Sequence, residues 1–261
     1  MKNSRENIIA ILIAGIVAFL YISGIPSVFF INIKLADVEP VCITLFINSI
    51  LAIGIGVSLV KVMIPMFELG FQLKNFKIGI MNYGVSCFVA FLIPCIAFWV
   101  GLFPFDYRPT VWKVLIEGVV YYISVGIIEE FFCRGLLQNA IEKLLCKRKN
   151  SEINAVVITA LIFGMGHIFG MIGMPVMLVL CKVIWAVGLG IYLGAIYVRT
   201  KNLWLVALFH TVIDLCGLPF CFSTQHVYPM ISAIIVLIAF LCFGIYGIFI
   251  LKHRNNFNHM L

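Results

Sequence analysis

Charged residues are scarce in this chain. Asp, Glu, Lys and Arg make up 11% of its 261 residues, whereas 63% of the residues are hydrophobic and 23 are phenylalanine. Soluble globular domains are about 45–50% apolar and about 25% charged. In water, a chain with so little charge would expose far more apolar surface than one core can bury. The composition therefore excludes a soluble enzyme, a disordered chain and a secreted disulfide-rich module.

The chain also lacks the alternation of apolar and polar residues that is typical of outer-membrane barrel strands. Its apolar runs are continuous, and a helix of about 20 apolar residues can cross a bilayer. We therefore predict an all-α, polytopic bundle of about eight transmembrane helices that forms a single membrane domain over residues 1–261. The predicted spans lie near residues 8–25, 40–60, 78–101, 112–138, 154–172, 175–198, 203–219 and 228–251.

Two further absences refine this prediction. The first run follows two basic residues, but no small-residue cleavage pattern comes after it, so we expect a retained helix rather than a signal peptide. No CxxC pair occurs among the nine cysteines, which lie mostly inside apolar runs. We expect these cysteines to be small buried side chains rather than metal ligands or disulfides.

The net charge of +7 does not indicate a nucleic-acid partner, because most of the 18 Lys and Arg residues lie between the apolar runs rather than along one face. Thirteen of them lie at the two termini and in loops 61–77, 139–153 and 199–202, and only three lie near the opposite loops. Positive charge marks the cytoplasmic side. We therefore predict an integral protein of a bacterial plasma membrane with both termini in the cytoplasm. The loops expected on the far side are 26–39, 101–112 and 219–229.

A charge in the middle of a bilayer costs at least about 2.5–3.5 kcal/mol, so each such residue needs a partner or a function. The fourth run contains Glu129, Glu130 and Arg134. Glu130 and Arg134 are four residues apart, so they share one helix face and can form an ion pair that fixes helix packing. Glu129 points about 100° away and has no local cation, which leaves it free to act as a general base.

Three more polar residues are expected at a similar depth. His167 lies in the fifth run, and His210 and Asp214 lie four residues apart in the seventh, where Asp214 could orient the imidazole or bind a metal. Glu129, His167 and His210 lie roughly 13–21 Å from the predicted cytoplasmic flank. These groups can converge as a hydrolytic site, with or without zinc, that polarises a water between Glu129 and His167.

Other polar residues in the runs have simpler explanations. Lys182 lies near one end of the sixth run, so we expect it to extend its ammonium group to the interface. We expect Glu117, near the outer interface, to have a minor role at most. Two GxxxG pairs, at 166–170 and 190–194, are places where helices can approach closely.

The polar motifs resemble those of the CAAX-protease and bacteriocin-processing (CPBP) family of intramembrane proteases. They are EExxxR at 129–134, FxxxH at 163–167 and HxxxD at 210–214, in this order on separate runs. Segments 70–77 and 188–204 are also similar to the family. The resemblance covers about residues 68–220, which form the family-like core, whereas the first two runs and the last carry no family signature.

This resemblance implies an intramembrane endopeptidase that hydrolyses a peptide bond of a membrane-associated or prenylated, CAAX-type peptide or protein. In that family the first glutamate of EExxxR and the histidine of FxxxH activate water, and the last motif supplies a histidine and usually an asparagine. The implied catalytic residues are Glu129, His167, His210 and Asp214, and the implied structural support is Glu130, Arg134 and Phe163.

Two aspects of the implied mechanism stay open. Asp214 stands where the family usually has Asn, and an ionised Asp cannot donate a hydrogen bond to an oxyanion. The family is labelled as metalloproteases, yet a metal-free mechanism is also argued for it. Glu129, His167 and His210 could therefore bind Zn²⁺ or another divalent metal, or act without one.

Two other functions compete with proteolysis. The first is a non-catalytic bacteriocin self-immunity or regulatory membrane protein of the same fold that binds a peptide or a partner. The second is a transporter with a proton relay, although no inverted repeat or pair of broken helices supports it. The intact Glu129, His167 and His210 favour the protease. The expected partners are the lipid bilayer and a membrane-associated substrate, and the sequence does not indicate the oligomeric state.

Overall fold

The computed structural model describes residues 2–23, 34–225 and 227–253. Over these residues the chain is helical without any β-strand, and eight segments are long and apolar enough to cross a membrane. The prediction of an all-α, polytopic bundle of about eight spans is confirmed. Five of the spans are single helices: α1 (Lys2–Ser23), α2 (Pro40–Met63), α3 (Phe76–Gly101), α8 (Val176–Thr200) and α10 (Met230–Lys252).

The three spans that carry the polar motifs are composite. The fourth runs continuously from Val111 to Leu144, six residues beyond its predicted end. The fifth consists of α7 (Ser151–Gly166) and the 3-10 turn η4 (Phe169–Met171), and the seventh of α9 (Leu203–Asp214) and the 3-10 segment η5 (Leu215–Phe222). The parts of the fourth are α4 (Val111–Leu115), the π-helical η2 (Ile116–Val120), α5 (Tyr121–Glu130), the π-helical η3 (Phe131–Gln138) and α6 (Asn139–Leu144).

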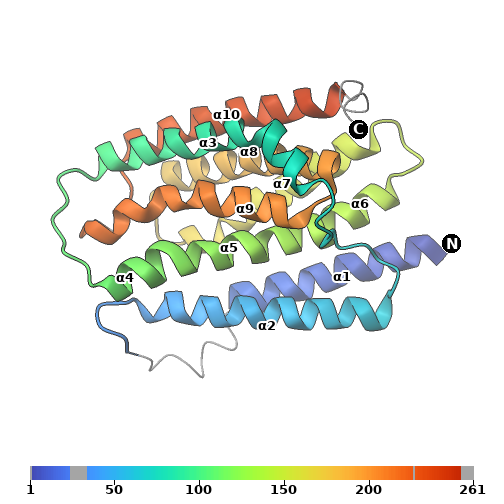
Figure 1. The fold of residues 1–261 in the computed structure, drawn as a ribbon, viewed down its shortest axis with the longest axis horizontal. Coiled ribbons are helices and arrows are strands. Elements are labelled where there is room, and N and C mark those ends of the chain that lie inside the picture. Colours follow the sequence, from blue (N-terminus) through green and yellow to red (C-terminus); the bar gives the residue numbers. More distant parts are fainter. Residues whose placement is uncertain (1, 24–33, 226, 254–261) are drawn as a thin grey trace.

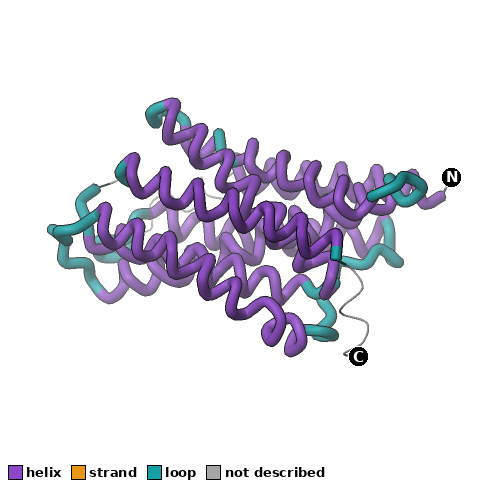
Figure 2. Tube along the Cα trace, turned by 90° about the horizontal axis from the view of Figure 1, so that it is seen from above, coloured by secondary structure: helices purple, strands orange, loops and turns teal. Residues whose placement is uncertain are grey.

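The spans form one bundle in which α1 begins and α10 ends at the same end (Figures 1 and 2). The α1–α2 hairpin lies along one side and the α3–α10 pair along the other. Between them α5 packs against α9, and α8 packs against both α7 and α10. The fourth span, which carries the first motif, therefore contacts both the fifth and the seventh spans, and the polar residues of the three motifs lie in one region.

Local sequence explains where several helices begin. Proline precedes or opens α2, α8 and α10, where its missing N–H needs no partner and its fixed φ suits the first turn. Asn202 caps α9, because its side-chain oxygen accepts a hydrogen bond of 2.9 Å from the backbone N–H of Leu205. The Asn202 amide also donates to the carbonyls of Gln72 and Lys74 at 2.9 Å each. The start of α9 is thus tied to the segment before α3.

Helices α5 and α9 approach closely at Gly126. A Cβ at this position would lie 2.9 Å from the backbone nitrogen of Thr211, closer than side chains normally come. Only glycine permits this approach, and Gly126 is one turn before Glu129 while Thr211 follows His210. The contact therefore sets the spacing between the two helices that carry the central polar residues.

The two GxxxG pairs differ in role. A Cβ at Gly190 would lie 3.0 Å from the Cβ of Ala160, so the pair at 190–194 does lie where α8 packs on α7. No atom of the described residues lies within 4 Å of the corresponding position at Gly166 or Gly170. Among these residues, the pair at 166–170 is therefore not a helix-packing site.

Side-chain hydrogen bonds join several loops at the end of the bundle that lies opposite the beginning of α1. Asp37 accepts hydrogen bonds from the Tyr107 hydroxyl (2.7 Å) and from both the hydroxyl and the backbone N–H of Thr110. These bonds, that from the Thr110 hydroxyl above all, hold the pKa of Asp37 well below its usual range. Asp106 similarly accepts from the backbone and hydroxyl of Thr224. The start of the fourth span is therefore anchored to two neighbouring loops.

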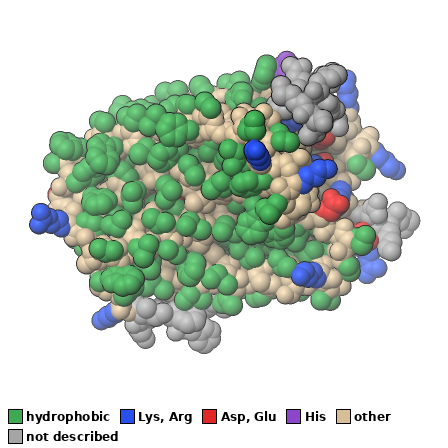
Figure 3. All heavy atoms as spheres, viewed as in Figure 1, with side chains coloured by type: hydrophobic (Ala, Val, Ile, Leu, Met, Phe, Trp, Pro, Cys, Tyr) green, Lys and Arg blue, Asp and Glu red, His purple; other side chains and the backbone are tan. Residues whose placement is uncertain are grey.

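The surface fits a bilayer. Large apolar side chains cover the visible face along the length of the bundle, whereas charged side chains are concentrated toward its ends (Figure 3). The chain is an integral membrane protein. Which end faces the cytoplasm stays a prediction, as does the single-domain organisation. Most of the predicted far-side loop 26–39 lies outside the described residues, whereas 101–112 is described throughout and 219–229 except for residue 226.

Candidate active site

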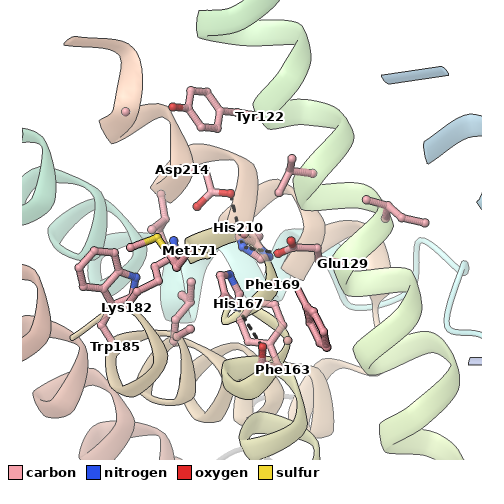
Figure 4. Close-up of a pocket in the computed structure, with 18 of the residues that line it drawn as sticks. Tyr122, Glu129, Phe163, His167, Phe169, Met171, Lys182, Trp185, His210 and Asp214 are labelled. Atoms are coloured by element: carbon pink, nitrogen blue, oxygen red, sulfur yellow. Dashed lines mark hydrogen bonds and ion pairs between the residues drawn. The ribbon is translucent and has the colours of Figure 1, made fainter. Parts of the chain in front are cut away.

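A cavity of about 740 Å³ lies within the bundle. All eight spans contribute residues to its walls, α2 by a single residue, and most of the lining side chains are apolar. Glu129, His167, His210 and Asp214 all line it, so the structure brings the four predicted catalytic residues to one cavity (Figure 4). A largely apolar cavity with a few convergent polar groups is the usual form of a ligand or substrate site.

The predicted pair of Glu130 and Arg134 is present and buried. Arg134 Nη1 donates to Glu130 Oε1 at 2.7 Å, and the two side chains are 1% and 0% exposed. Arg134 Nη2 also donates to the carbonyl of Gly190 at 2.9 Å, and the guanidinium carbon lies 5.5 Å from the Phe163 ring centre. The pair therefore joins η3 to α7 and α8 as well as neutralising itself.

Glu130 has a second partner that sequence reasoning missed. Its Oε1 also accepts a hydrogen bond of 2.7 Å from His210 Nδ1, across 80 residues of sequence. A carboxylate oxygen can accept more than one hydrogen bond. The sequence predicted one partner for Glu130, Arg134, and a carboxylate can accept further hydrogen bonds. That capacity does not identify His210 as the second donor.

This bond decides which nitrogen of His210 faces the cavity. Because Nδ1 carries the proton shared with Glu130, Nε2 points toward Glu129 and Asp214. Nε2 lies 3.6 Å from Glu129 Oε2 and 3.5 Å from Asp214 Oδ2. These separations are longer than a good direct hydrogen bond and leave both carboxylates able to bind another molecule.

His167 comes directly after the last residue of α7. Its Nδ1 donates to the carbonyl of Phe163 at 2.9 Å, since a carbonyl can only accept, and this leaves Nε2 as an acceptor. The Phe163 ring meets the His167 ring edge-on at 4.7 Å and the His210 ring at 5.9 Å. Phe163, predicted as structural support, thus contacts both histidines.

Glu129 and Asp214 are less enclosed than Glu130. Their side chains are 17% and 24% exposed, and both point into the space around the histidines (Figure 4). Within the described part of the chain, neither carboxylate has a Lys or Arg nitrogen within 4.0 Å. The expectation that Glu129 lacks a local cation therefore agrees with the geometry, and His210 is its nearest basic partner.

Lys182 was expected at the interface but lines the cavity instead. Figure 4 shows its side chain between Trp185 and Met171, on the other side of the histidines from Glu129. Its ammonium lies 4.9 Å from the Trp185 ring centre. No periodic signal distinguishes a lysine that extends to the interface from one that points inward, since both lie near a helix end.

The polar side chains of the site are of types that can bind a metal. Among the described residues, no group of three or more His, Cys, Asp or Glu side chains is placed to hold a metal ion. Nδ1 of His210 is bonded to Glu130 and Nδ1 of His167 to the Phe163 carbonyl, which leaves Nε2 of each histidine available, as in histidines that bind a metal. Imidazole and carboxylate are donors that zinc accepts, but here they do not converge on one point. Metal dependence stays a prediction.

The comparisons with known proteins bear on the same part of the chain. Residues 111–216 match the family model of the Rce1-like, type II CAAX prenyl endopeptidases. The matched segment contains all seven predicted site residues and lies inside the predicted core at 68–220. No curated protein matches the chain. The family recognised from the three motifs is thereby confirmed.

Proposed function

Since residues 111–216 belong to the Rce1-like family of CAAX-type intramembrane proteases, we propose that this chain hydrolyses a peptide bond within the membrane. The proposed substrate is a membrane-associated or prenylated, CAAX-type peptide or protein. Glu129 and His167 activate the attacking water, and His210 with Asp214 stabilises the oxyanion. Glu130, Arg134 and Phe163 hold the two histidines in place.

The observation that carries this proposal is the bond between Glu130 and His210 Nδ1. It directs Nε2 into the cavity, beside Glu129 and Asp214. With Nδ1 bonded to Glu130, a proton on Nε2 makes the imidazole a donor at both nitrogens, and Nε2–H can then donate a hydrogen bond to an oxygen that gains negative charge. A donor fixed in advance and shielded from water stabilises a transition state strongly.

Bond making and bond breaking can be assigned to these groups. Glu129 takes a proton from water as the oxygen attacks the peptide carbonyl carbon, while His167 Nε2 accepts the second water hydrogen and orients the nucleophile. The carbonyl oxygen becomes an oxyanion and receives hydrogen bonds from His210 Nε2–H. The carbon–nitrogen bond then breaks, and the proton held by Glu129 passes to the leaving amine.

Asp214 can act in two ways at this step. If it is protonated, its hydroxyl donates to the oxyanion, as the amide of the family's usual Asn would. If it is ionised, it stabilises the charge on His210, from which it is 3.5 Å away. We favour the donor role, because Asn at this position in the family can donate a hydrogen bond but carries no charge.

The test is cleavage by the full-length protein, purified and reconstituted in lipid nanodiscs. The probe is a fluorescent, S-farnesylated peptide that ends in a CAAX sequence, and mass spectrometry identifies the bond that is cut. Cleavage by the wild type that depends on Glu129 supports the proposal. A folded protein that binds the peptide without cutting it would instead favour the immunity or regulatory function.

A further inference from the structure

Lys182 is the one Lys or Arg among the described residues that line the cavity. It is the seventh residue of α8, so its backbone lies about 9 Å from the beginning of that helix. Its side chain points inward rather than toward the helix end (Figure 4). The position thus places one cation in the same cavity as the candidate catalytic residues.

The ammonium of Lys182 has no anionic partner within the described part of the chain. No carboxylate oxygen lies within 4.0 Å of it, and its contact is the face of Trp185 at 4.9 Å. A cation–π contact holds a cation in place but satisfies none of its three N–H donors. A lysine at this depth is costly without a partner, so an anion that enters the cavity would gain these donors.

The surroundings of Lys182 indicate the shape of that anion. Trp185, Tyr228, Phe98 and Phe220 form a chain of aromatic contacts with ring centres 5.4–6.4 Å apart. All four line the cavity beside Lys182. An apolar group joined to a carboxylate fits this combination of aromatic faces and one ammonium group.

We propose that Lys182 binds the free C-terminal carboxylate of the substrate peptide, with the last side chain against the aromatic residues. This rests on the proposed protease function and adds a specificity-determining residue to it. A cavity of about 740 Å³ lies within the size range of ligand pockets. A peptide end fits such a cavity, and every peptide end carries a carboxylate.

A different role for Lys182 is that of counter-ion to the catalytic carboxylates. Its ammonium group shares the cavity with Glu129, His167 and Asp214. A counter-ion would affect every substrate equally, whereas a carboxylate-binding residue discriminates between a peptide acid and the same peptide with a C-terminal amide. The two roles are therefore separable by changing the peptide rather than the protein.

The experiment uses the fluorescent, S-farnesylated CAAX peptide in two forms, free acid and C-terminal amide. Binding is measured with full-length Glu129→Gln protein in nanodiscs, and cleavage with the wild type. We expect the acid to bind about 10- to 100-fold more tightly than the amide. Adding Lys182→Met should remove this preference by weakening acid binding alone, whereas Lys182→Arg should keep it. Lys113→Met, outside the cavity, is the matched control and should leave the preference unchanged.

Several results would overturn the proposal. The first is equal binding of the acid and the amide. The second is an equal loss of affinity for both forms in Lys182→Met, and the third is no binding of either form. Cleavage separates the two proposals. A protein that cuts acid and amide equally keeps the protease function and loses the role of Lys182. One that binds the acid through Lys182 but cuts neither form loses the protease function alone.

Discussion

Glu130 and His210 lie 80 residues apart in sequence and share a hydrogen bond of 2.7 Å in the interior of the bundle. The same carboxylate oxygen accepts from Arg134, also at 2.7 Å. Glu130 therefore has two roles: it forms an ion pair within the fourth span, and it orients His210 of the seventh span. The stability of the ion pair and the orientation of His210 are thus coupled through Glu130.

Glu129→Gln should abolish proteolysis while the protein still accumulates in the membrane. The amide keeps the size of the side chain but cannot take a proton from water, and general-base catalysis contributes about 10²–10⁴-fold to rate. Peptide cleavage and immunoblotting of membranes measure the two effects. Glu117→Gln is the matched control, because Glu117 lies in the same span, pairs with Lys113 and does not line the cavity. Cleavage by a folded Glu129→Gln protein would remove Glu129 from the mechanism.

Arg134→Ala should lower the amount of folded protein. It leaves Glu130, which is fully buried, without its cation, and the loss of one partner of a buried pair costs about 3–5 kcal/mol. Thermal unfolding in detergent measures the change. Lys201→Ala breaks the pair with Glu142, whose side chains are 42% and 23% exposed, and should cost about 1 kcal/mol or less. Normal stability together with lost activity in Arg134→Ala would assign Arg134 to the chemistry instead.

Asp214→Asn should retain most activity, and Asp214→Ala should lose about 10²–10³ in rate. Asn keeps the donor that we assign to Asp214 and removes only the charge, whereas Ala removes the hydrogen bond to the oxyanion. Both variants are assayed with and without a chelator. An inactive Asn variant, in combination with a wild type that the chelator inhibits, would contradict the donor role and indicate a metal held partly by Asp214.

Gly126→Ala should destabilise the protein and reduce its activity. The added Cβ would lie 2.9 Å from the backbone nitrogen of Thr211, and such overpacking costs about 1–3 kcal/mol. The shift of α9 away from α5 would also stretch the bond between Glu130 and His210. Gly15→Ala is the matched control, since no atom of the described part of the chain lies within 4 Å of its Cβ position. Equal stability of the two variants would show that the α5–α9 contact is not close-packed.

Both termini should lie in the cytoplasm. A cysteine at Gln225, in a chain without the nine native cysteines, should react with a membrane-impermeant thiol reagent in intact cells. A cysteine at Lys149 should react only after the cells are opened. Both positions are exposed and lie outside the spans. The reverse pattern would invert the orientation and would place loops 139–153 and 199–202 outside the cell.

Composition and the length of the apolar runs were sufficient to place the chain in a membrane and to locate its spans. Apolar runs long enough to cross a bilayer are a property of consecutive residues, so composition and length predict them without knowledge of packing. Spacings of four residues are equally local, because one helix turn brings their side chains together. The pair of Glu130 and Arg134 and the proximity of His210 to Asp214 were therefore predictable. The three motifs also identified the family.

The contacts between spans, by contrast, depend on how the helices pack. The bond from His210 to Glu130, the inward direction of Lys182 and the contact of one GxxxG pair but not the other depend on which helix faces face each other. The two π-helical segments of the fourth span also depend on packing, since their residues form ordinary helix by local preference. A membrane removes the polar–apolar periodicity that would indicate the inner face of a soluble helix, because lipid and protein interior are both apolar. That is why spans and motifs were readable from the chain, and the partners of its buried charges were not.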